Sequence, residues 1–468
     1  MHSPARSFPS RWMKVVRYSD HPMIVVLGGG PAGRIAAMHL AHAGKEVLLA
    51  ERGVIGGQCL NSGCMVVCAL NDAARVIRNA RDLERLGIID RSPEVNFPAL
   101  IGEMKGIQGK IAGILDSETR SSGVEIQYGK DAVLHGNEVR LGGEVLHPDA
   151  IIAATGSSPA IPNIPGLSKE GVYNPRTLAQ MDRLPKNMVI LGGGVMAAEF
   201  AYIFSSFGCD VTLLARSDVL KVLDEKQRAV ALKELEGITI HSGTTLLAVN
   251  GERHLGSVSV RTPDASQTEI ECDALFIATG LSPRSENLHG IAKGPSGEVL
   301  VDSHMETSIK GVYAAGDVTG PPYLTPVARH EGITAAENIL GRVTTMDYRF
   351  FPQSVNLATE HAFCNPSPDG GMVSVSLPGP AGPGTFWKVP FNATGLSKVS
   401  VHPETGSLQG ISTSGPGAGM IASYIAFLMQ KGYTADDFAS FLEVHPETDG
   451  VHGLLNYLSG YLKRKNTP

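Results

Sequence analysis

The chain has 468 residues, of which 43% are hydrophobic and 18% are charged, and its formal net charge is −6. This length exceeds what a single hydrophobic core usually supports, so we expect two to four domains. The charge leaves no basic excess to neutralise a phosphate backbone, which argues against a nucleic-acid partner. No stretch approaches the roughly 18 uninterrupted apolar residues that a membrane span requires, so we expect no membrane partner.

The N-terminal segment and the cysteines bear on where the protein works. Residues 1–22 are rich in basic residues and serine, as transit peptides are, but we expect either a disordered extension before the first strand or a start site assigned too early. Six cysteines are too few for a secreted disulfide scaffold, and three of them, Cys59, Cys64 and Cys68, lie close together in the sequence. This grouping indicates redox or metal chemistry in a reducing compartment, and we expect a cytoplasmic protein.

The first predicted elements are a strand, a glycine-rich turn, a helix and a second strand. Residues 23–27 are apolar, GGGPAG follows at 28–33, a helix is expected to extend to His42, and a strand at 46–50 precedes Glu51. This order is a βαβ unit. A glycine-rich turn in such a unit can bring a pyrophosphate onto the backbone N–H groups of a helix N-terminus.

The turn carries a dinucleotide-binding pattern. Gly28, Gly30 and Gly33 have the G-x-G-x-x-G spacing, and Glu51 would accept hydrogen bonds from an adenosine ribose. The glycine spacing alone also occurs in ordinary tight turns. The preceding strand, the following helix and the acidic residue at the expected distance together favour the nucleotide site.

Cys59 and Cys64 follow in the segment GGQCLNSGC, with four residues between them. Near a helix N-terminus the pKa of a cysteine falls to roughly 3.5–7.5, which favours the thiolate that redox chemistry uses. A zinc site or a structural role in the core are the alternatives. Zinc would require paired short spacings with nearby histidines, which this segment lacks, so we expect no bound metal.

The βαβ order recurs in the second half of the chain. A strand at 187–191 leads into GGGVMAAE at 192–199, a helix is expected to Phe207, and a strand follows at 210–214. The glycine motif of this unit consists of Gly192, Gly194 and Ala197. Two dinucleotide-binding folds are therefore expected.

The second unit ends its second strand without an acidic residue, because Ala215 stands there and Arg216 follows. An acid would favour a free ribose 2′-hydroxyl, whereas an arginine can pair with a 2′-phosphate in fork geometry. We therefore expect NADPH rather than NADH. A solvated arginine at a strand end, without a ligand, would have the same sequence.

Two similar apolar strands end in Thr-Gly, one in IIAATGSSP at 151–159 and one in ALFIATGLSP at 274–283. GVYAAGD at 311–317 is followed by a helical pattern that runs through Asn338. The segment at 390–412 then alternates as antiparallel strands do, and helices are expected to the end. A third domain of α+β type is expected from about residue 348.

The segment from Gly56 to Cys64 resembles the redox-active disulfide segment of the class I pyridine nucleotide-disulfide oxidoreductases. This family includes dihydrolipoamide dehydrogenase, glutathione reductase and mercuric reductase. The resemblance extends over essentially the whole chain from Met23. Its landmarks in chain order are the motif at 28–33, Cys59 and Cys64, Thr155 and Gly156, the motif at 192–199, Thr279 and Gly280, Gly316 and Asp317, and His445 and Pro446.

The resemblance implies an α/β fold with two Rossmann-like dinucleotide-binding domains and a C-terminal α+β dimerisation domain. An FAD domain would comprise residues 23–160 and 283–347, an NAD(P)H domain 161–282 and an interface domain 348–468. The implied protein is a homodimeric flavoenzyme in which NADPH reduces FAD and FAD reduces the cysteine pair. The acceptor would be a small-molecule or protein disulfide or another small oxidant, which the motif alone does not identify.

The resemblance also implies roles for individual residues. Cys64 would lie against the flavin, Cys59 would exchange with the substrate, and His445 would shuttle protons at the thiol pair of the partner subunit. Asp317 would hydrogen-bond the ribityl chain of FAD. The implied cofactor-binding residues are Gly28, Gly30, Gly33, Glu51, Gly129, Thr155, Gly156, Ser157, Gly192, Gly194, Ala197, Glu199, Arg216, Gly280, Asp317, Tyr323, Leu324, Thr325 and Pro326.

Two positions depart from the family pattern near the substrate. A glutamate five residues after the histidine orients it in the family, but here that position is Gly450, and Glu447 or Asp449 would have to substitute. Such base catalysis supplies about 10²- to 10⁴-fold, so exchange with an ordinary disulfide could be much slower. Leu281 follows Gly280 where the family has an arginine, which leaves the substrate class open.

A third departure follows Cys64, where the family has a proline and then a lysine but this chain has MVVC at 65–68. The family lysine pairs with a glutamate matching Glu199. We expect this carboxylate either to become protonated or to find another hydrogen-bond donor. Cys68 is either a third thiol one helical turn beyond Cys64 or, as we expect, a small buried apolar residue.

Two alternative functions stay open. A thiolate-based reductase or reductive carboxylase would use the altered histidine site to suppress protonation. An electron-transfer subunit would use FAD and thiols within a larger complex. Mercuric reductase itself is disfavoured, because the chain has no N-terminal metal-binding cysteine pair and no cysteines in its C-terminal tail.

Overall fold

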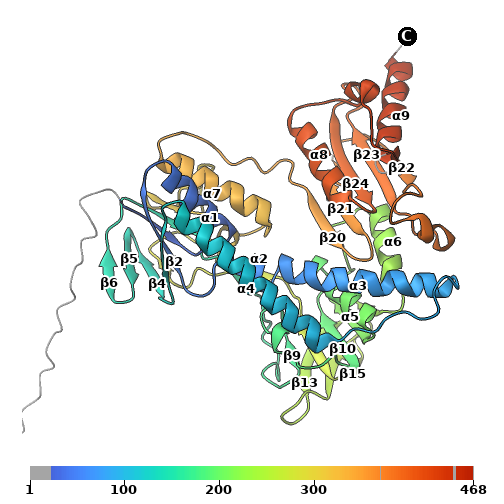
Figure 1. Ribbon diagram of the computed structural model, residues 1–468, viewed down its shortest axis with the longest axis horizontal. Coiled ribbons are helices and arrows are strands. Elements are labelled where there is room, and N and C mark those ends of the chain that lie inside the picture. Colours follow the sequence, from blue (N-terminus) through green and yellow to red (C-terminus); the bar gives the residue numbers. More distant parts are fainter. Residues whose placement is uncertain (1–22, 369, 446–448, 467–468) are drawn as a thin grey trace, which may run out of the picture. The chain divides into compact units, whose positions relative to one another are not determined.

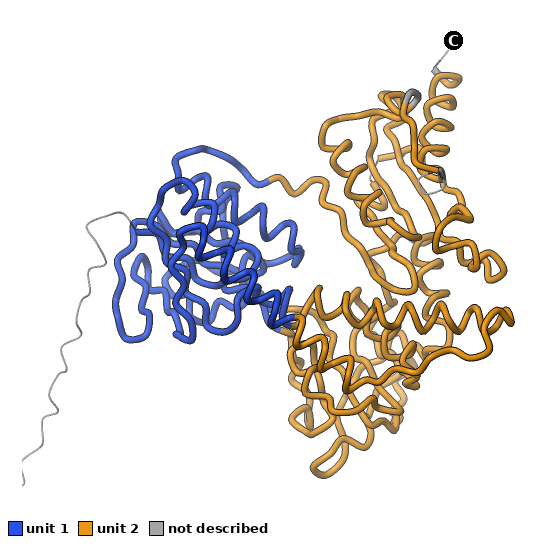
Figure 2. Tube along the Cα trace, in the orientation of Figure 1, with its two compact units in different colours: residues 1–61, 108–158, 282–346 blue, residues 62–107, 159–281, 347–468 orange. Residues whose placement is uncertain are grey.

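The computed structural model describes residues 23–368, 370–445 and 449–466, except for the side chains at 439, 440, 449 and 466. The predicted extension at 1–22 lies outside these residues. The chain divides into two compact units (Figure 2). Unit 1 comprises residues 1–61, 108–158 and 282–346, and unit 2 comprises residues 62–107, 159–281 and 347–468.

Unit 1 is built on a five-stranded parallel sheet with the order β19-β7-β1-β2-β3 (Figure 1). The central strand β1 is MIVVL, and all five of its residues are buried. A strand covered on both faces is apolar throughout, as this one is. The strands are Met23–Leu27 (β1), Glu46–Glu51 (β2), Glu125–Tyr128 (β3), Ala150–Ala153 (β7) and Val312–Ala314 (β19).

Helices α1 (Pro31–His42) and α7 (Thr325–Ile339) pack against each other in unit 1. Their close approach requires Gly332, because a Cβ atom there would lie 2.4 Å from the carbonyl oxygen of Ala32. A smaller sheet has the order β18-β4-β5-β6. The remaining elements are Ala132–His135 (β4), Glu138–Leu141 (β5), Glu144–Leu146 (β6), Leu288–His289 (β18), Gly57–Asn61 (α2) and the 3-10 helix Asp317–Thr319 (η2).

Unit 2 contains a second parallel sheet, with the order β12-β11-β10-β16-β9, and an antiparallel meander, β13-β14-β15. Its strands are Val172–Tyr173 (β9), Asn187–Leu191 (β10), Asp210–Ala215 (β11), Thr239–Ser242 (β12), Thr245–Asn250 (β13), Ser257–Arg261 (β14), Gln267–Glu271 (β15) and Ala274–Ile277 (β16). Its helices are Cys64–Arg85 (α3), Val195–Phe207 (α5), Glu225–Glu234 (α6) and the 3-10 helix Leu178–Gln180 (η1).

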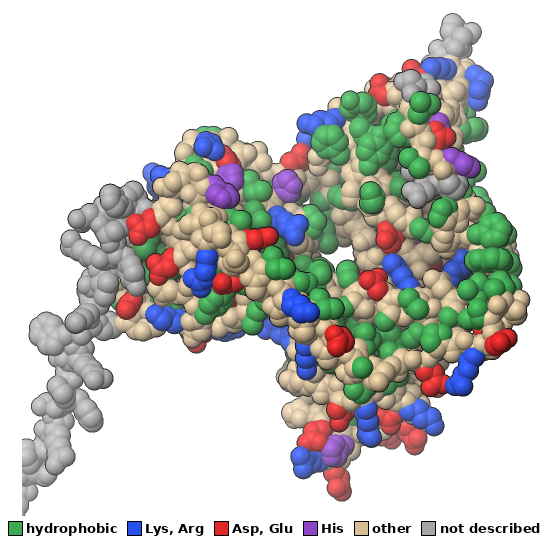
Figure 3. Space-filling view, in the orientation of Figure 1, with side chains coloured by type: hydrophobic (Ala, Val, Ile, Leu, Met, Phe, Trp, Pro, Cys, Tyr) green, Lys and Arg blue, Asp and Glu red, His purple; other side chains and the backbone are tan. Residues whose placement is uncertain are grey.

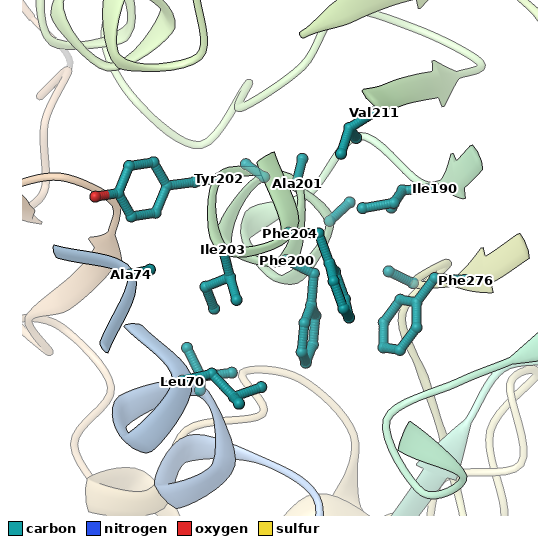
Figure 4. Close-up of a cluster of buried hydrophobic side chains, with 14 of the residues drawn as sticks. Leu70, Ala74, Ile190, Phe200, Ala201, Tyr202, Ile203, Phe204, Val211 and Phe276 are labelled. Carbon is teal, nitrogen blue, oxygen red and sulfur yellow. The ribbon is translucent and has the colours of Figure 1, made fainter. Parts of the chain in front are cut away.

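Helix α5 forms the centre of the largest hydrophobic core in unit 2 (Figure 4). The rings of Phe200 and Phe204 lie 4.4 and 6.0 Å from the ring of Phe276 on β16, measured between centroids. On another side of α5, helix α3 contributes Leu70 and Ala74, both fully buried. This packing fixes α3 against the second nucleotide-type fold.

The C-terminal part of unit 2 is an antiparallel sheet with the order β20-β21-β24-β23-β22. Helices α8 and α9 pack against the sheet and complete a separate hydrophobic core. The elements are Gln353–Asn356 (β20), Glu360–Cys364 (β21), Val373–Pro378 (β22), Leu396–Val401 (β23), Leu408–Ser414 (β24), Ala418–Gln430 (α8), Asp449–Asn466 (α9), and the 3-10 helices Phe386–Phe391 (η3) and Ala435–Ser440 (η4).

The predicted α/β class, with two parallel sheets and a C-terminal antiparallel sheet, is confirmed. Three elements fall near the unit boundaries, namely Phe97–Ser121 (α4), Ser157–Pro159 (β8) and Leu281–Pro283 (β17). None of the described helices combines the length and the apolar character needed to cross a membrane.

Candidate functional site

The first glycine motif forms the turn between β1 and α1. Gly28 has φ +110°, and a Cβ atom there would lie 2.3 Å from the carbonyl oxygen of Ala154. A Cβ atom on Gly33 would lie 2.0 Å from the carbonyl oxygen of Gly28. Gly30 is the N-cap of α1 and has no side chain to cover the helix N-terminus. The turn is therefore too tight for other residues and leaves bare backbone where an anion can approach.

Glu51 ends β2 beside this turn, and its carboxylate is held by two backbone donors. The N–H of Gly29 donates to Oε2 at 2.7 Å, and the N–H of Gly53 donates to Oε1 at 2.6 Å. The Gly129 N–H donates to the backbone carbonyl of Glu51 at 3.0 Å. Each carboxylate oxygen has further acceptor capacity, so Glu51 is oriented but able to bind a hydroxyl group.

Asp317 lies in the same unit, and Ser157 Oγ donates to its Oδ2 at 2.6 Å. Burial raises the pKa of the Asp317 carboxyl group, and the bond from Ser157 opposes this shift. The structure thus brings together two residues that lie 160 positions apart in the sequence. A buried carboxyl group held by Ser157 and by its own backbone N–H can still accept from, or donate to, a ligand hydroxyl.

The loop before Asp317 is held by Glu331, which sequence reasoning missed. The Gly316 N–H donates to Oε2 of Glu331 at 2.7 Å, and Glu331 is only 3% exposed. Glu331 lies on α7, two turns after Thr325, and Leu324 is the N-cap of this helix. No motif marks the glutamate, because its partner is a backbone group.

The two Thr-Gly turns have the same local structure, each within its own unit. In unit 1, Thr155 Oγ1 donates to the carbonyl oxygen of Arg284 at 2.6 Å, and Gly156 has φ +73°. In unit 2, Thr279 Oγ1 donates to the carbonyl oxygen of Ala160, and Gly280 has φ +100°. These bonds fix the chain as it leaves β7 and β16. Tyr323, Leu324, Thr325 and Pro326 lie at the start of α7.

The second glycine motif is similarly tight. A Cβ atom on Gly192, which has φ +147°, would lie 2.3 Å from the carbonyl oxygen of Ala278, and Ala197 is fully buried. Gly194 is the N-cap of α5, and a Cβ atom there would meet open space. Arg216 follows β11 with its side chain exposed. The cation is therefore accessible beyond the carboxyl end of β11, beside the strand that precedes the glycine turn.

The two cysteines of the predicted redox pair lie on consecutive helices. Cys59 is half-buried on α2 in unit 1, whereas Cys64 is exposed and is the first residue of α3 in unit 2. Helix α3 has 22 residues, so its N-terminal partial positive charge favours a thiolate at Cys64. Among the described residues, no three side chains of His, Cys, Asp or Glu are grouped as metal ligands would be.

The prediction that Cys68 is a small buried residue of the core is wrong, because Cys68 is exposed. Partial desolvation raises the pKa of its thiol, and the nearby charges of Cys64, Asp72 and Glu199 raise it further. The exposure arises because α3 turns positions 64 and 68 to the same side. Cys68 is therefore an accessible thiol that stays protonated at neutral pH.

Glu199 on α5 has both a hydrogen-bond donor and a raised pKa in place of the missing lysine. The Asn356 N–H donates to its Oε1 at 2.9 Å, and the side-chain amide of Asn356 lies 3.5 Å from the same oxygen. Burial nevertheless raises the pKa of Glu199 to about 7, and the charge of Cys64 contributes to the rise. Both expected outcomes are met, since the carboxyl group finds a donor and also holds its proton near neutral pH.

Arg75 supplies a positive charge near Glu199 and acts to lower its pKa. Its Nε donates to the carbonyl oxygen of Leu357 at 2.7 Å, and its buried Nη2 has no hydrogen-bond partner among the described residues. Asn71 also donates to Leu357, at 3.3 Å. Positions 64, 68, 71 and 75 lie on one side of α3 by helical spacing. Counting that spacing from Cys64 would have predicted that Asn71 and Arg75 lie near the thiols.

The histidine site is described only in part. His445 is exposed, whereas Glu447 and the side chain of Asp449 lie outside the described residues. Gly450 is in the first turn of α9, and a Cβ atom there would lie 2.9 Å from Oγ of Ser397. A side chain at this position would therefore require the Ser397 hydroxyl to shift.

Comparisons with known proteins agree with the fold and with the motifs. The family model described as "Pyridine nucleotide-disulphide oxidoreductase" matches residues 22–332. The chain is 33% identical over 327 residues to a dihydrolipoyl dehydrogenase of Acholeplasma laidlawii, covering 68% of this chain and 96% of that protein. It is 30% identical over 458 residues to a dihydrolipoyl dehydrogenase of Thermus scotoductus, covering 92% and 95%.

One solved structure has the same fold. It is the crystal structure of LpdA from Mycobacterium tuberculosis, which is 24% identical in sequence and superposes with a TM-score of 0.81. The superposition covers 93% of this chain and 99% of that chain. All parts of the fold described above therefore occur together in one known architecture.

Proposed function

Because the chain belongs to the pyridine nucleotide-disulphide oxidoreductase family, we propose that it is an FAD-dependent enzyme that passes electrons from NADPH through Cys59 and Cys64 to a disulfide. The names of its relatives favour a small acceptor of the lipoyl class. The observation that carries the proposal is Cys64 itself, which begins a 22-residue helix that packs on the helix of the buried Glu199.

The residues of unit 1 fit FAD. We assign the cofactor to residues 23–160 and 283–347, of which 62–107 belong to unit 2. The residues proposed to hold it lie in unit 1, with Gly30 at a helix N-terminus for the pyrophosphate, Glu51 for the ribose and Asp317 for the ribityl chain. When bound, FAD supplies the two-electron step between a nicotinamide and a disulfide. The protein residues contribute orientation, because Ser157 and the backbone of the glycine turn fix both carboxyl groups.

We assign NADPH to residues 161–282. The bare N-terminus of α5 at Gly194 would hold the pyrophosphate, and Gly192 and Ala197 permit the close turn. Arg216 is exposed and would pair with the 2′-phosphate. This residue is the basis for preferring NADPH over NADH.

Proton and thiol chemistry would fall to Cys59, Cys64 and Glu199. The dipole of α3 stabilises a thiolate on Cys64, and a negative charge there raises the pKa of Glu199. Reduction of the pair would therefore favour a proton on Glu199. Cys59 would be the thiol that exchanges with the substrate disulfide.

We propose that residues 348–468 form the interface of a homodimer. Helix α8 exposes Met420, Tyr424 and Phe427, which are 81%, 43% and 55% exposed and follow i, i+4, i+7 spacing. Hydrophobic side chains gather over this helix in Figure 3. Such a stripe is typical of a surface that a partner covers. His445 would then serve the thiol pair of the partner subunit.

An anaerobic titration of the oxidised holoenzyme with NADPH tests this function. The wild type should take up four electrons with a long-wavelength thiolate-to-flavin band, whereas Cys59→Ser should take up two. Cys364→Ala, which alters a buried cysteine of β21, is the matched control and should still take up four. Uptake of two electrons by the wild type would show that the cysteines are not coupled to the flavin.

The packing at Gly450 favours one second candidate, a thiolate-based reductase or reductive carboxylase. Glycine at this position provides no carboxylate to orient His445, and a side chain there would require the Ser397 hydroxyl to shift. A weaker base near the thiols would leave a carbanion or thiolate unprotonated for longer. NADPH-dependent cleavage of C–C or C–S bonds, with no turnover of small disulfides, would favour this function.

A further inference from the structure

The C-terminal part of unit 2 contains a cavity of about 140 Å³ that the proposed electron transfer does not use. It lies between the sheet strands β23 and β24 and the first turns of α8 and α9, and its wall includes Ser397, Thr413, Gly417 and Gly450. A cavity of about 150 Å³ accommodates a benzene-sized molecule. The space is therefore large enough for a small organic ligand.

Two hydroxyl groups in the wall belong to buried residues, and neither has a hydrogen bond to another described residue. Ser397 is 5% exposed and Thr413 is 3% exposed. They are cross-strand neighbours on β23 and β24, on the sheet face that also carries Val399 and Ile411 into the core with α8 and α9. Ser397 Oγ points at the start of α9, since a Cβ atom on Gly450 would lie 2.9 Å from it. Neither oxygen is fully enclosed by protein, so both can donate to a ligand or to solvent in the cavity.

The start of α9 adds further donors to the same cavity. Gly450 and Val451 line it and lie in the first turn of this 18-residue helix, where N–H groups have no acceptor within the helix. The helix dipole there favours a negative charge. At α8 the Gly419 N–H is already bonded to the carboxylate of Glu360 at 3.0 Å. One negative charge is thus in place nearby, which favours a singly charged ligand over a dianion.

The rest of the wall is mixed, with the hydroxyl-bearing residues Thr385, Thr394 and Ser414 beside an apolar part. Pro416 and Ile421 from the start of α8 and Val451 from α9 line it, and no lysine or arginine of the described chain does. A strongly charged anion such as phosphate would lack a cation to pair with. The charged group of an anion with a short hydrocarbon tail would contact the hydroxyl groups and the start of α9, and its tail would contact the apolar residues.

We propose that this cavity binds a short-chain monocarboxylate. Its carboxylate would accept from the hydroxyl groups of Ser397 and Thr413 and from the first turn of α9, and its alkyl chain would contact Pro416 and Ile421. The lack of a side chain at Gly450 is what opens the space beside Ser397. This site is separate from every residue that we assign to electron transfer, so its test does not depend on that assignment.

Saturation-transfer NMR with butyrate on the full-length FAD-loaded protein tests the proposal. Butyrate should bind saturably at a single site, while butyramide, which has the same shape and no charge, should not compete with it. Ser397→Ala and Thr413→Val should each weaken butyrate binding about tenfold, because each removes a hydrogen bond to a charged group. Sodium chloride at equal ionic strength controls for screening.

Ser412→Ala is the matched control. Ser412 is also buried and without a hydrogen-bond partner, but it lies next to Thr413 on β24 and points to the other face of the sheet. Its substitution should leave butyrate binding unchanged. Retained flavin and unchanged circular dichroism identify variants that fold, and either of the two site variants suffices for the comparison. Absence of saturable binding, equal binding of butyramide, or equal loss in Ser412→Ala would each overturn the proposal.

Discussion

Replacing Glu199 with glutamine should make the protein more stable at alkaline pH. Burial raises the pKa of Glu199 from 4.5 to about 7, and each pH unit corresponds to about 1.4 kcal/mol. Ionising this group above pH 7 therefore costs the folded state about 3 kcal/mol relative to the unfolded chain. Glutamine keeps an acceptor oxygen for the Asn356 N–H but carries no charge.

The direction in which the free energy of unfolding changes with pH follows from which state binds the Glu199 proton. Between pH 4.5 and about 7 the folded chain holds the Glu199 proton that the unfolded chain has released, so the free energy of unfolding falls as the pH rises. In Glu199→Gln the free energy of unfolding does not decrease in this way, because glutamine does not ionise. The stability difference between the variant and the wild type should be small at pH 5 and reach about 3 kcal/mol at pH 8. Urea unfolding of both holoproteins across this range measures it.

Glu234 is a matched control, because its pKa is lowered whereas the pKa of Glu199 is raised. It is also buried, but the charge of His361, 3.2 Å away, and the hydrogen bonds from Thr359 lower its pKa despite the burial. Its contribution to stability is present above the unfolded pKa and is lost as the pH falls. Glu234→Gln should therefore destabilise the protein at pH 7. A Glu199→Gln effect that does not change between pH 5 and pH 8 would refute the reasoning.

Other perturbations have equally direct readouts. Arg216→Ala should raise the KM for NADPH about tenfold and leave the KM for NADH unchanged in steady-state assays, because only the 2′-phosphate loses a partner. Asp82→Asn should lower the free energy of unfolding by about 3 kcal/mol in urea titrations, since it leaves the buried Lys388 ammonium, 2.5 Å away, without its counter-charge. Iodoacetamide should alkylate Cys68 slowly at pH 7 and much faster above pH 9, because its pKa is raised.

Local patterns were sufficient to predict the nucleotide-type folds. Strand β1 covers the predicted residues 23–27, and α1 ends at the predicted His42. The strand at 187–191 is also found as predicted. These segments carry their own signals, since an apolar run followed by a glycine turn specifies a buried strand and a helix start without reference to the rest of the chain.

The surroundings of the thiols could be predicted only in part. Asn356 lies 157 positions from Glu199, and its decisive donor is a backbone N–H that no residue type reveals. Glu331 binds the backbone of Gly316 in the same way. Cys68 was expected in the core because cysteine is usually buried, but the helical phase of α3 turns it outward with Cys64. Contacts between segments far apart in the sequence determine the surroundings of these residues, and such contacts produce no recognisable pattern in the sequence.

Two of the three departures from the family pattern, those near Glu199 and at Gly450, have different structural consequences. Near Glu199 the chain supplies substitutes for the missing lysine, since Asn356 donates hydrogen bonds and Arg75 contributes a positive charge. At Gly450 a side chain would require the Ser397 hydroxyl to shift, because a Cβ atom there would lie 2.9 Å from its Oγ. Neither substitute near Glu199 neutralises it fully, so its pKa stays near 7. A carboxyl group with a pKa near 7 can both hold and release a proton at neutral pH, and under the proposed function Glu199 would do so beside Cys64.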